Sequence, residues 1–108
     1  MHRFALGILL CIFAAAGRPT TPGEILHHEF LAPLRMTQKR LADHIGCDVK
    51  VVNRIVNGRS AVTAEMALKL GAAFGTSPEF WLNAQKACDL HRAVKAAGTL
   101  PEPLLHAS

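Results

Sequence analysis

The sequence predicts an all-α domain of five helices, and three observations support this fold class. The chain has 108 residues, the size of one ordinary domain, and half of them are hydrophobic, so a buried core is possible. Aromatic residues make up only 6%, none is tyrosine, and strand-forming runs are scarce. Alanine, leucine, lysine and glutamate dominate the second half of the chain, and these residues favour helix.

Residues 1–19 differ in composition from everything that follows. A basic start, an apolar run over 4–16 and a small-residue end at Gly17 form the pattern of a signal peptide. The apolar run is too short to span a membrane comfortably. A start codon assigned too far upstream would give the same pattern, so both interpretations stay open at this point.

The first helix is expected from Pro22 to about Ala32. Thr21 and Glu24 have the spacing of a capping box, and proline at the first helical position loses no hydrogen bond. An apolar stripe with helical spacing follows: Ile25, Leu26, Phe30 and Leu31. Because Pro33 disfavours helical geometry at the residue before it, we expect the helix to end there.

Two short helices follow with the spacing of a helix-turn-helix motif. Thr37 can cap the second helix, "QKRLADHIG" (38–46), in which Gly46 allows a left-handed turn. Asp48 can cap the third helix, "VKVVNRIVNG" (49–58). A short link between two short helices is typical of this motif.

The remaining two helices have clear start and stop signals. Thr63 is expected to open the fourth helix and Gly75 to end it. Ser77 and Pro78 open a fifth helix that runs to Gly98. The chain therefore divides into three parts: an apolar extension (1–19), a helix-turn-helix domain with a C-terminal helix (20–98) and a flexible tail (99–108).

The excess positive charge lies in one stretch of the chain. Between Arg35 and Arg59, six cations and two aspartates leave a net charge of +4, whereas the other residues carry equal numbers of cations and anions. A patch of this kind attracts polyanions, and nucleic acid first. A merely solvated face would spread the charge more evenly.

The third helix separates apolar from polar residues. On one face lie Val52, Ile55 and Val56, and on the opposite face lie Lys50, Asn53, Arg54 and Asn57. A recognition helix needs this division, because its apolar face holds it on the domain while its polar face enters the major groove. Arginine or lysine can bind guanine there, and asparagine can bind adenine. Gln38 and Lys39, at the start of the second helix, can bind a DNA phosphate, and Arg59 would reach the DNA backbone.

Three longer segments are more specific than a bare helix-turn-helix. They are "PGEIL", "MTQKRLADHIG" and "VNRIVNGRSAVTAEMALKLGAAFGTSPEFWLNAQKACDL". With these segments, residues 22–90 resemble the HigA/VapI antitoxins, within the lambda-repressor-like (XRE) group of helix-turn-helix proteins. The resemblance covers about two thirds of the chain.

The resemblance implies a homodimer that binds palindromic operator DNA upstream of its own gene pair. It also implies neutralisation of a small HigB-like toxin, an mRNA-cleaving endonuclease. Carried over by position, the DNA contacts fall on Thr37, Gln38, Lys39, Lys50, Val51, Asn53, Arg54 and Arg59. Val51 departs from the Thr or Ser that is common in the family and could meet a thymine methyl. Cys47 stands where the family often has valine.

The same resemblance bears on the location of the protein and on its toxin-binding face. An operator-binding antitoxin works in the cytoplasm without a membrane partner, so residues 1–19 are interpreted as a mis-assigned or dispensable extension. Three acidic residues outside the basic stretch are expected to face a basic toxin: Glu24 and Glu29 on the first helix and Glu79 on the fifth. The distal part of the fifth helix is expected to join the dimer interface.

No catalysis, cofactor or metal is expected. Cys88 and His91, and the run His27-His28-Glu29, lack the four-ligand spacing of a structural zinc site. Cys47 and Cys88 are interpreted as small buried hydrophobes, and Trp81 as a core residue packed against Phe74 and Leu70. Two alternatives remain: a solitary XRE-type regulator without a toxin, and an exported or membrane-tethered interaction module.

Overall fold

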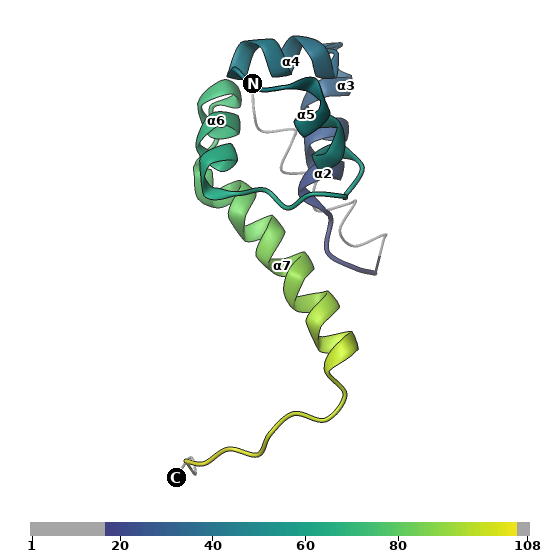
Figure 1. The fold of residues 1–108 in the computed structure, drawn as a ribbon, viewed down its shortest axis with the longest axis vertical. Helices are drawn as coiled ribbons and strands as arrows, with labels where there is room; N and C mark the ends of the chain where they lie inside the picture. Colours follow the sequence, from purple (N-terminus) through teal and green to yellow (C-terminus); the bar gives the residue numbers. More distant parts are fainter. Residues whose placement is uncertain (1–16, 106–108) are drawn as a thin grey trace.

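The computed structural model describes residues 17–105, and every regular element within this range is helical (Figure 1). The first helix consists of three consecutive segments, α2 (Pro22–Ile25), η1 (Leu26–Leu31) and α3 (Ala32–Leu34), which we call helix 1 together. The remaining helices are α4 (Gln38–Ile45), α5 (Val49–Val56), α6 (Ala64–Phe74) and α7 (Pro78–Ala97). The predicted all-α fold of five helices is thereby confirmed.

Each helix begins where its capping residue predicts. The side-chain oxygen of the N-cap accepts a first-turn backbone N–H in every case, from Thr21, Thr37, Asp48, Thr63 and Ser77. At helix 1 the capping box is complete, because the Glu24 carboxylate also accepts from the Thr21 N–H. Gly46 and Gly75 end α4 and α6 in the left-handed conformation.

The prediction that helix 1 ends near Ala32 is wrong. The helix continues through Pro33, and Arg35 closes it with a left-handed backbone of φ 52°. The segment before the proline, Leu26–Leu31, is a π-helical turn, in which the Ala32 N–H donates to the His27 carbonyl five residues earlier. An interior proline normally clashes with the carbonyl four residues before it. The π turn shifts the hydrogen-bond pattern by one residue there, so the helix accommodates the proline.

The aromatic core lies where helix 1, α6 and α7 meet. The ring centroids of Phe30 and Phe74 are 4.6 Å apart, and Phe30 lies 5.5 Å from the fully buried Trp81. The Trp81 indole Nε1–H donates to Thr76 Oγ1 at 2.7 Å, so its polar group has a partner. The predicted packing of Trp81 against Phe74 is confirmed, with a centroid distance of 6.5 Å.

The start of helix 1 lies directly against the C-terminal end of α5. A Cβ at Gly23 would overlap the carbonyl oxygen of Ile55 and lie 2.7 Å from that of Val56, so only glycine permits this approach. Pro22 and Ile25 on either side are buried. The "PGEIL" motif is therefore used within the fold, where it fixes helix 1 on α5.

The distal half of α7 extends away from the other helices (Figure 1). Cys88 is its last buried residue, and the Cys88 Sγ lies 3.5 Å from the Thr20 carbonyl oxygen, so the segment before helix 1 covers this thiol. Beyond it, Leu90 and Val94 are 59% and 66% exposed. No helix within residues 17–105 is both long and apolar enough to cross a membrane. The signal-like run over 4–16 lies outside the described residues.

Candidate nucleic-acid interface

α4 and α5 form the predicted helix-turn-helix. The turn between them is set by Gly46, with φ 75°, and by the Cys47 N–H, which donates to the Ala42 carbonyl at 2.9 Å. Asp48 then caps α5 through the Lys50 N–H at 2.8 Å. Cys47 itself is half-buried, whereas Cys88 is buried as expected. The turn is thus fixed by backbone bonds and one cap.

The two faces of α5 separate as the sequence predicts. Val52 and Ile55 are 1% and 3% exposed and hold the helix on the core. The predicted contact residues Lys50, Asn53 and Arg54 are exposed on the other face, and Val51 and Val56 are half-buried at its edges. The exposed polar face lies next to the start of α4.

One hydrogen bond joins the predicted contact residues of the two helices. The Asn53 Nδ2 donates to the Gln38 Oε1 at 3.0 Å, across fifteen positions of the chain. The Asn57 Nδ2 donates to the Asn53 carbonyl, also at 3.0 Å. The Gln38–Asn53 bond leaves the Gln38 amide NH₂ as a donor and the Asn53 Oδ1 as an acceptor. These two groups therefore present one donor and one acceptor at the same surface.

The other two predicted contact residues near α4, Thr37 and Lys39, lie at its N-terminal end. Thr37 is the N-cap, and its Oγ1 accepts from the Arg40 N–H at 3.0 Å. Lys39 is exposed and lies 3.1 Å from Asp43 one turn later. Both of these charged side chains are largely exposed, and such pairs contribute little, so Lys39 can leave Asp43 for another anion at small cost.

The cations of the basic stretch lie at the surface of the structure. All six of these cations are exposed. Only Lys39 forms an ion pair among the residues described; the other five do not: Arg35, Arg40, Lys50, Arg54 and Arg59. Arg59 follows α5, and its backbone N–H donates to the Arg54 carbonyl at 2.8 Å. These guanidinium and ammonium groups are available to an anionic partner.

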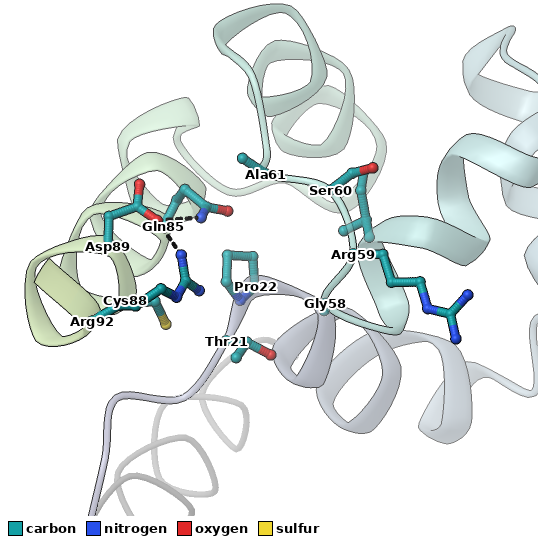
Figure 2. Close-up of a pocket in the computed structure, with 12 residues that line it drawn as sticks. Thr21, Pro22, Gly58, Arg59, Ser60, Ala61, Gln85, Cys88, Asp89 and Arg92 are labelled. Atoms are coloured by element: carbon teal, nitrogen blue, oxygen red, sulfur yellow. Dashed lines mark hydrogen bonds and ion pairs between the residues drawn. The ribbon is translucent and has the colours of Figure 1, made fainter. Parts of the chain in front are cut away.

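A groove of about 320 Å³ lies between the start of helix 1, the loop after α5 and one face of α7. Figure 2 shows Pro22 between the loop after α5 and the side chains of Gln85, Asp89 and Arg92 along α7. The Arg59 side chain points away from these three residues (Figure 2). Within residues 17–105 no group of three histidine, cysteine, aspartate or glutamate side chains is arranged to hold a metal ion.

The acidic face predicted on helix 1 is not present. Glu29 is only 2% exposed, because it follows the buried Ile25 by four residues and lies on the same side of the helix. Its burial raises the pKa of the carboxyl group. Glu24 is occupied by Arg18, which donates two hydrogen bonds to it at 2.9 and 2.7 Å. Only Glu79 of the three residues is exposed and free of an ion pair in the described chain.

The sequence analysis did not identify Gln85 as a candidate functional residue. Gln85 on α7 accepts a hydrogen bond from the Val62 N–H at 2.9 Å, twenty-three positions away in the loop after α5. A single glutamine on a helix carries no local pattern that would reveal such a partner.

The comparisons with known proteins agree with this geometry. A family model described as helix-turn-helix matches residues 28–81. Antitoxin HigA-1 of Vibrio cholerae is 48% identical over 73 residues, which cover 68% of this chain and 69% of the relative. This chain belongs to the HigA antitoxin family of helix-turn-helix proteins. The resemblance predicted from the sequence is thereby confirmed, and members of this family are DNA-binding proteins rather than enzymes.

Two solved structures of the HigA family have the same fold. An addiction module antidote protein from Coxiella burnetii is 41% identical, with a TM-score of 0.72, and the match covers 79% of this chain and 99% of that one. The Pseudomonas aeruginosa antitoxin HigA, solved with the higBA promoter, is 37% identical, with a TM-score of 0.74. That match covers 82% of this chain and all of the Pseudomonas chain.

Proposed function

We propose that this chain is a sequence-specific DNA-binding antitoxin that represses its own operon and neutralises a HigB-like mRNA-cleaving toxin. The observation that carries the DNA-binding part is the exposed polar face of α5, together with five cations of the basic stretch that form no ion pair with another described residue. The Pseudomonas relative, solved with its promoter, supports operator DNA as the partner. DNA and toxin together imply that the protein works in the cytoplasm.

In this proposal α5 reads base edges in the major groove. Lys50 and Arg54 bind guanine acceptors, because both are exposed and neither forms an ion pair within residues 17–105. Gln38 and Asn53 together present a donor and an acceptor, which match the N7 and N6 groups of adenine. Val51, half-buried at the edge of this face, contacts a thymine methyl.

The remaining predicted residues hold the backbone of the DNA. Thr37 and Lys39 lie at the start of α4, and Arg59 lies just after α5, so they flank the recognition face. Such contacts fix the position of a protein on the duplex and carry no base preference.

The apolar residues exposed on distal α7 support a homodimer. Leu90 and Val94 are one turn apart and are both largely exposed in the described chain. Cys88 is not available for this interface, because Thr20 covers it. A two-fold dimer would present two copies of α5 to a palindromic operator.

Toxin neutralisation rests on family membership. A solitary regulator without a toxin is the second candidate, and the absence of an acidic face on helix 1 favours it. If a toxin is bound, α6 and α7 offer surfaces that leave the reading face of α5 free.

The DNA-binding part is tested by titrating operator and random DNA in parallel. Arg54→Ala and Lys50→Ala should each reduce the preference for the operator by about 1–3 kcal/mol. Lys39→Ala should instead weaken binding to operator and random DNA alike, because Lys39 is proposed to contact phosphate. An unchanged ratio of operator to random affinity for Arg54→Ala would show that α5 does not read the bases.

The toxin part is tested by co-expression with the neighbouring gene in a toxin-sensitive host. Rescue of growth together with co-purification of the two proteins is the expected result. Unrelieved arrest without co-purification would leave the solitary regulator.

A further inference from the structure

The loop between α5 and α6 carries Arg59, and its far end is held by the buried Val62 side chain and by one hydrogen bond from the Val62 backbone to a side chain of α7. At its near end the Arg59 N–H continues the hydrogen bonding of α5 to the Arg54 carbonyl. Ser60 and Ala61 are exposed and make no backbone hydrogen bond to the described residues. The next fixed point is the Val62 N–H, which donates to Gln85 Oε1 at 2.9 Å.

Gln85 is itself held in the orientation that this bond requires. Its Nε2 donates to Asp89 Oδ1 at 2.9 Å, and Asp89 lies 3.5 Å from the Arg92 guanidinium (Figure 2). An ionised carboxylate only accepts hydrogen bonds, so the NH₂ of Gln85 must face Asp89. The carbonyl oxygen of the same amide then faces the Val62 N–H.

A groove separates the middle of the loop from α7. The 320 Å³ groove lies between the loop and α7, and its lining includes Gly58, Ser60 and Ala61 together with Gln85 and Asp89. The Val62 side chain at the far end of the loop is buried in the core, whereas the Val62 backbone N–H has Gln85 as its partner. Without Gln85 the backbone from Ser60 to Val62 would lose this hydrogen bond and gain conformational freedom, although the Val62 side chain would stay in the core.

We propose that Gln85 is a positioning residue for DNA binding, which acts through Arg59. Its hydrogen bond fixes the Val62 backbone at the far end of the loop. The contact between Arg59 and the DNA backbone then forms with a smaller loss of loop entropy. The inference rests on the proposed DNA-binding function, and it gives the "WLNAQKACDL" segment of α7 a role that the recognition face does not explain.

The first test is made on the free protein, without DNA. Gln85→Met keeps the length of the side chain and removes the acceptor, so amide hydrogen exchange at Val62 should accelerate at least about tenfold. Gln85→Glu keeps an acceptor for Val62 and should restore much of the protection. Asn83→Met, an equivalent change at an exposed position of the same helix, should have no effect at Val62. Unchanged exchange in Gln85→Met would overturn the inference.

The second test is a double-mutant cycle on operator DNA. Gln85→Met should weaken binding about fivefold, the scale expected for partial ordering of one or two residues. In the Arg59→Ala background the same change should have no further effect, because the contact that Gln85 positions is already lost. The slope of log affinity against log salt should fall by about 2 per dimer in Arg59→Ala, which loses one phosphate contact per subunit, and stay nearly unchanged in Gln85→Met, which keeps the Arg59 charge.

The two experiments together distinguish failure of the inference from failure of the proposed DNA-binding function. If the wild-type protein binds no operator, the DNA-binding proposal itself fails, whereas the exchange experiment still tests whether Gln85 holds the Val62 backbone. If the wild type binds and Gln85→Met weakens binding equally with and without Arg59, then Gln85 does not act through Arg59 and the inference is wrong.

Discussion

Two glutamates on helix 1 titrate in opposite directions because their surroundings differ. Glu24 accepts hydrogen bonds from Arg18 and from the Thr21 N–H, and these lower the pKa of its carboxyl group from 4.5 to about 2. Glu29 has neither oxygen hydrogen-bonded within the described chain, and burial raises its pKa. One charge therefore stabilises the fold, whereas the other opposes it.

Glu24→Gln should lower the free energy of unfolding at pH 7 by about 1–2 kcal/mol, a value reduced by the partial exposure of Arg18. The folded-state pKa is depressed, so the stabilisation exists above the unfolded pKa and is lost as the pH falls toward 2. Glutamine can still complete the capping box. Denaturant unfolding at both ends of this range measures the difference, which should nearly vanish at pH 2.

Glu29→Met should raise the free energy of unfolding at pH 7 by about 1–3 kcal/mol, because it removes a buried carboxyl group that has no hydrogen-bond partner among residues 17–105. The folded-state pKa is raised, so native Glu29 is best tolerated at low pH and its cost grows as the pH rises through the folded pKa. The gain should therefore shrink near pH 4. Glu79→Met, at an exposed position, is the control. A loss of stability in Glu29→Met at pH 7 would contradict this account.

The residues that the sequence predicts best are those with near neighbours as partners. Thr37 and Ser77 cap helices through a backbone N–H three positions away, so their role is readable from the local pattern. Glu29 has no such partner, and its burial depends on how helix 1 packs. The bond between Gln38 and Asn53 crosses fifteen positions, and it exists only because α4 and α5 are packed together.

Helix 1 shows why element boundaries can differ from their prediction. The starts and ends of α4 and α6 follow local signals, and these were correctly expected. Pro33 is also a local signal, but its effect was cancelled by the π turn before it. The residues from Leu26 to Leu31 do not predict a π turn, because their apolar spacing also fits an ordinary α-helix.

Gly23→Ala should lower the free energy of unfolding by at least about 2 kcal/mol, because the added methyl group overlaps the backbone of α5. Helix 1 must then move away from the end of the recognition helix, so operator affinity should fall as well. Thermal unfolding and DNA titration measure the two effects. His27→Ala, at an exposed position of the same helix, should leave both nearly unchanged.

At the scale of the whole molecule, the main feature is the length of α7 beyond the other helices (Figure 1). Leu90→Asp combined with Val94→Asp should abolish the proposed homodimer, because both side chains would carry charge into an apolar interface. The fold should persist, since both positions are exposed.

Sedimentation velocity measures the oligomeric state, and operator titration should show a parallel loss of affinity. Lys86→Asp makes a similar change of charge on α7 at a residue that is not apolar, and it is the control. A wild-type protein that sediments as a monomer at micromolar concentration would refute the dimer on α7.

The fully buried Trp81 also determines what optical spectroscopy can report. The sequence has one tryptophan and no tyrosine, so fluorescence excited near 280 nm comes from this indole alone. Trp81 packs against Phe30 and Phe74 in the core and donates to Thr76. Its emission should therefore be blue-shifted and poorly quenched by iodide in the native protein. Intrinsic fluorescence will then follow unfolding faithfully, whereas DNA titrations will require a label on the nucleic acid.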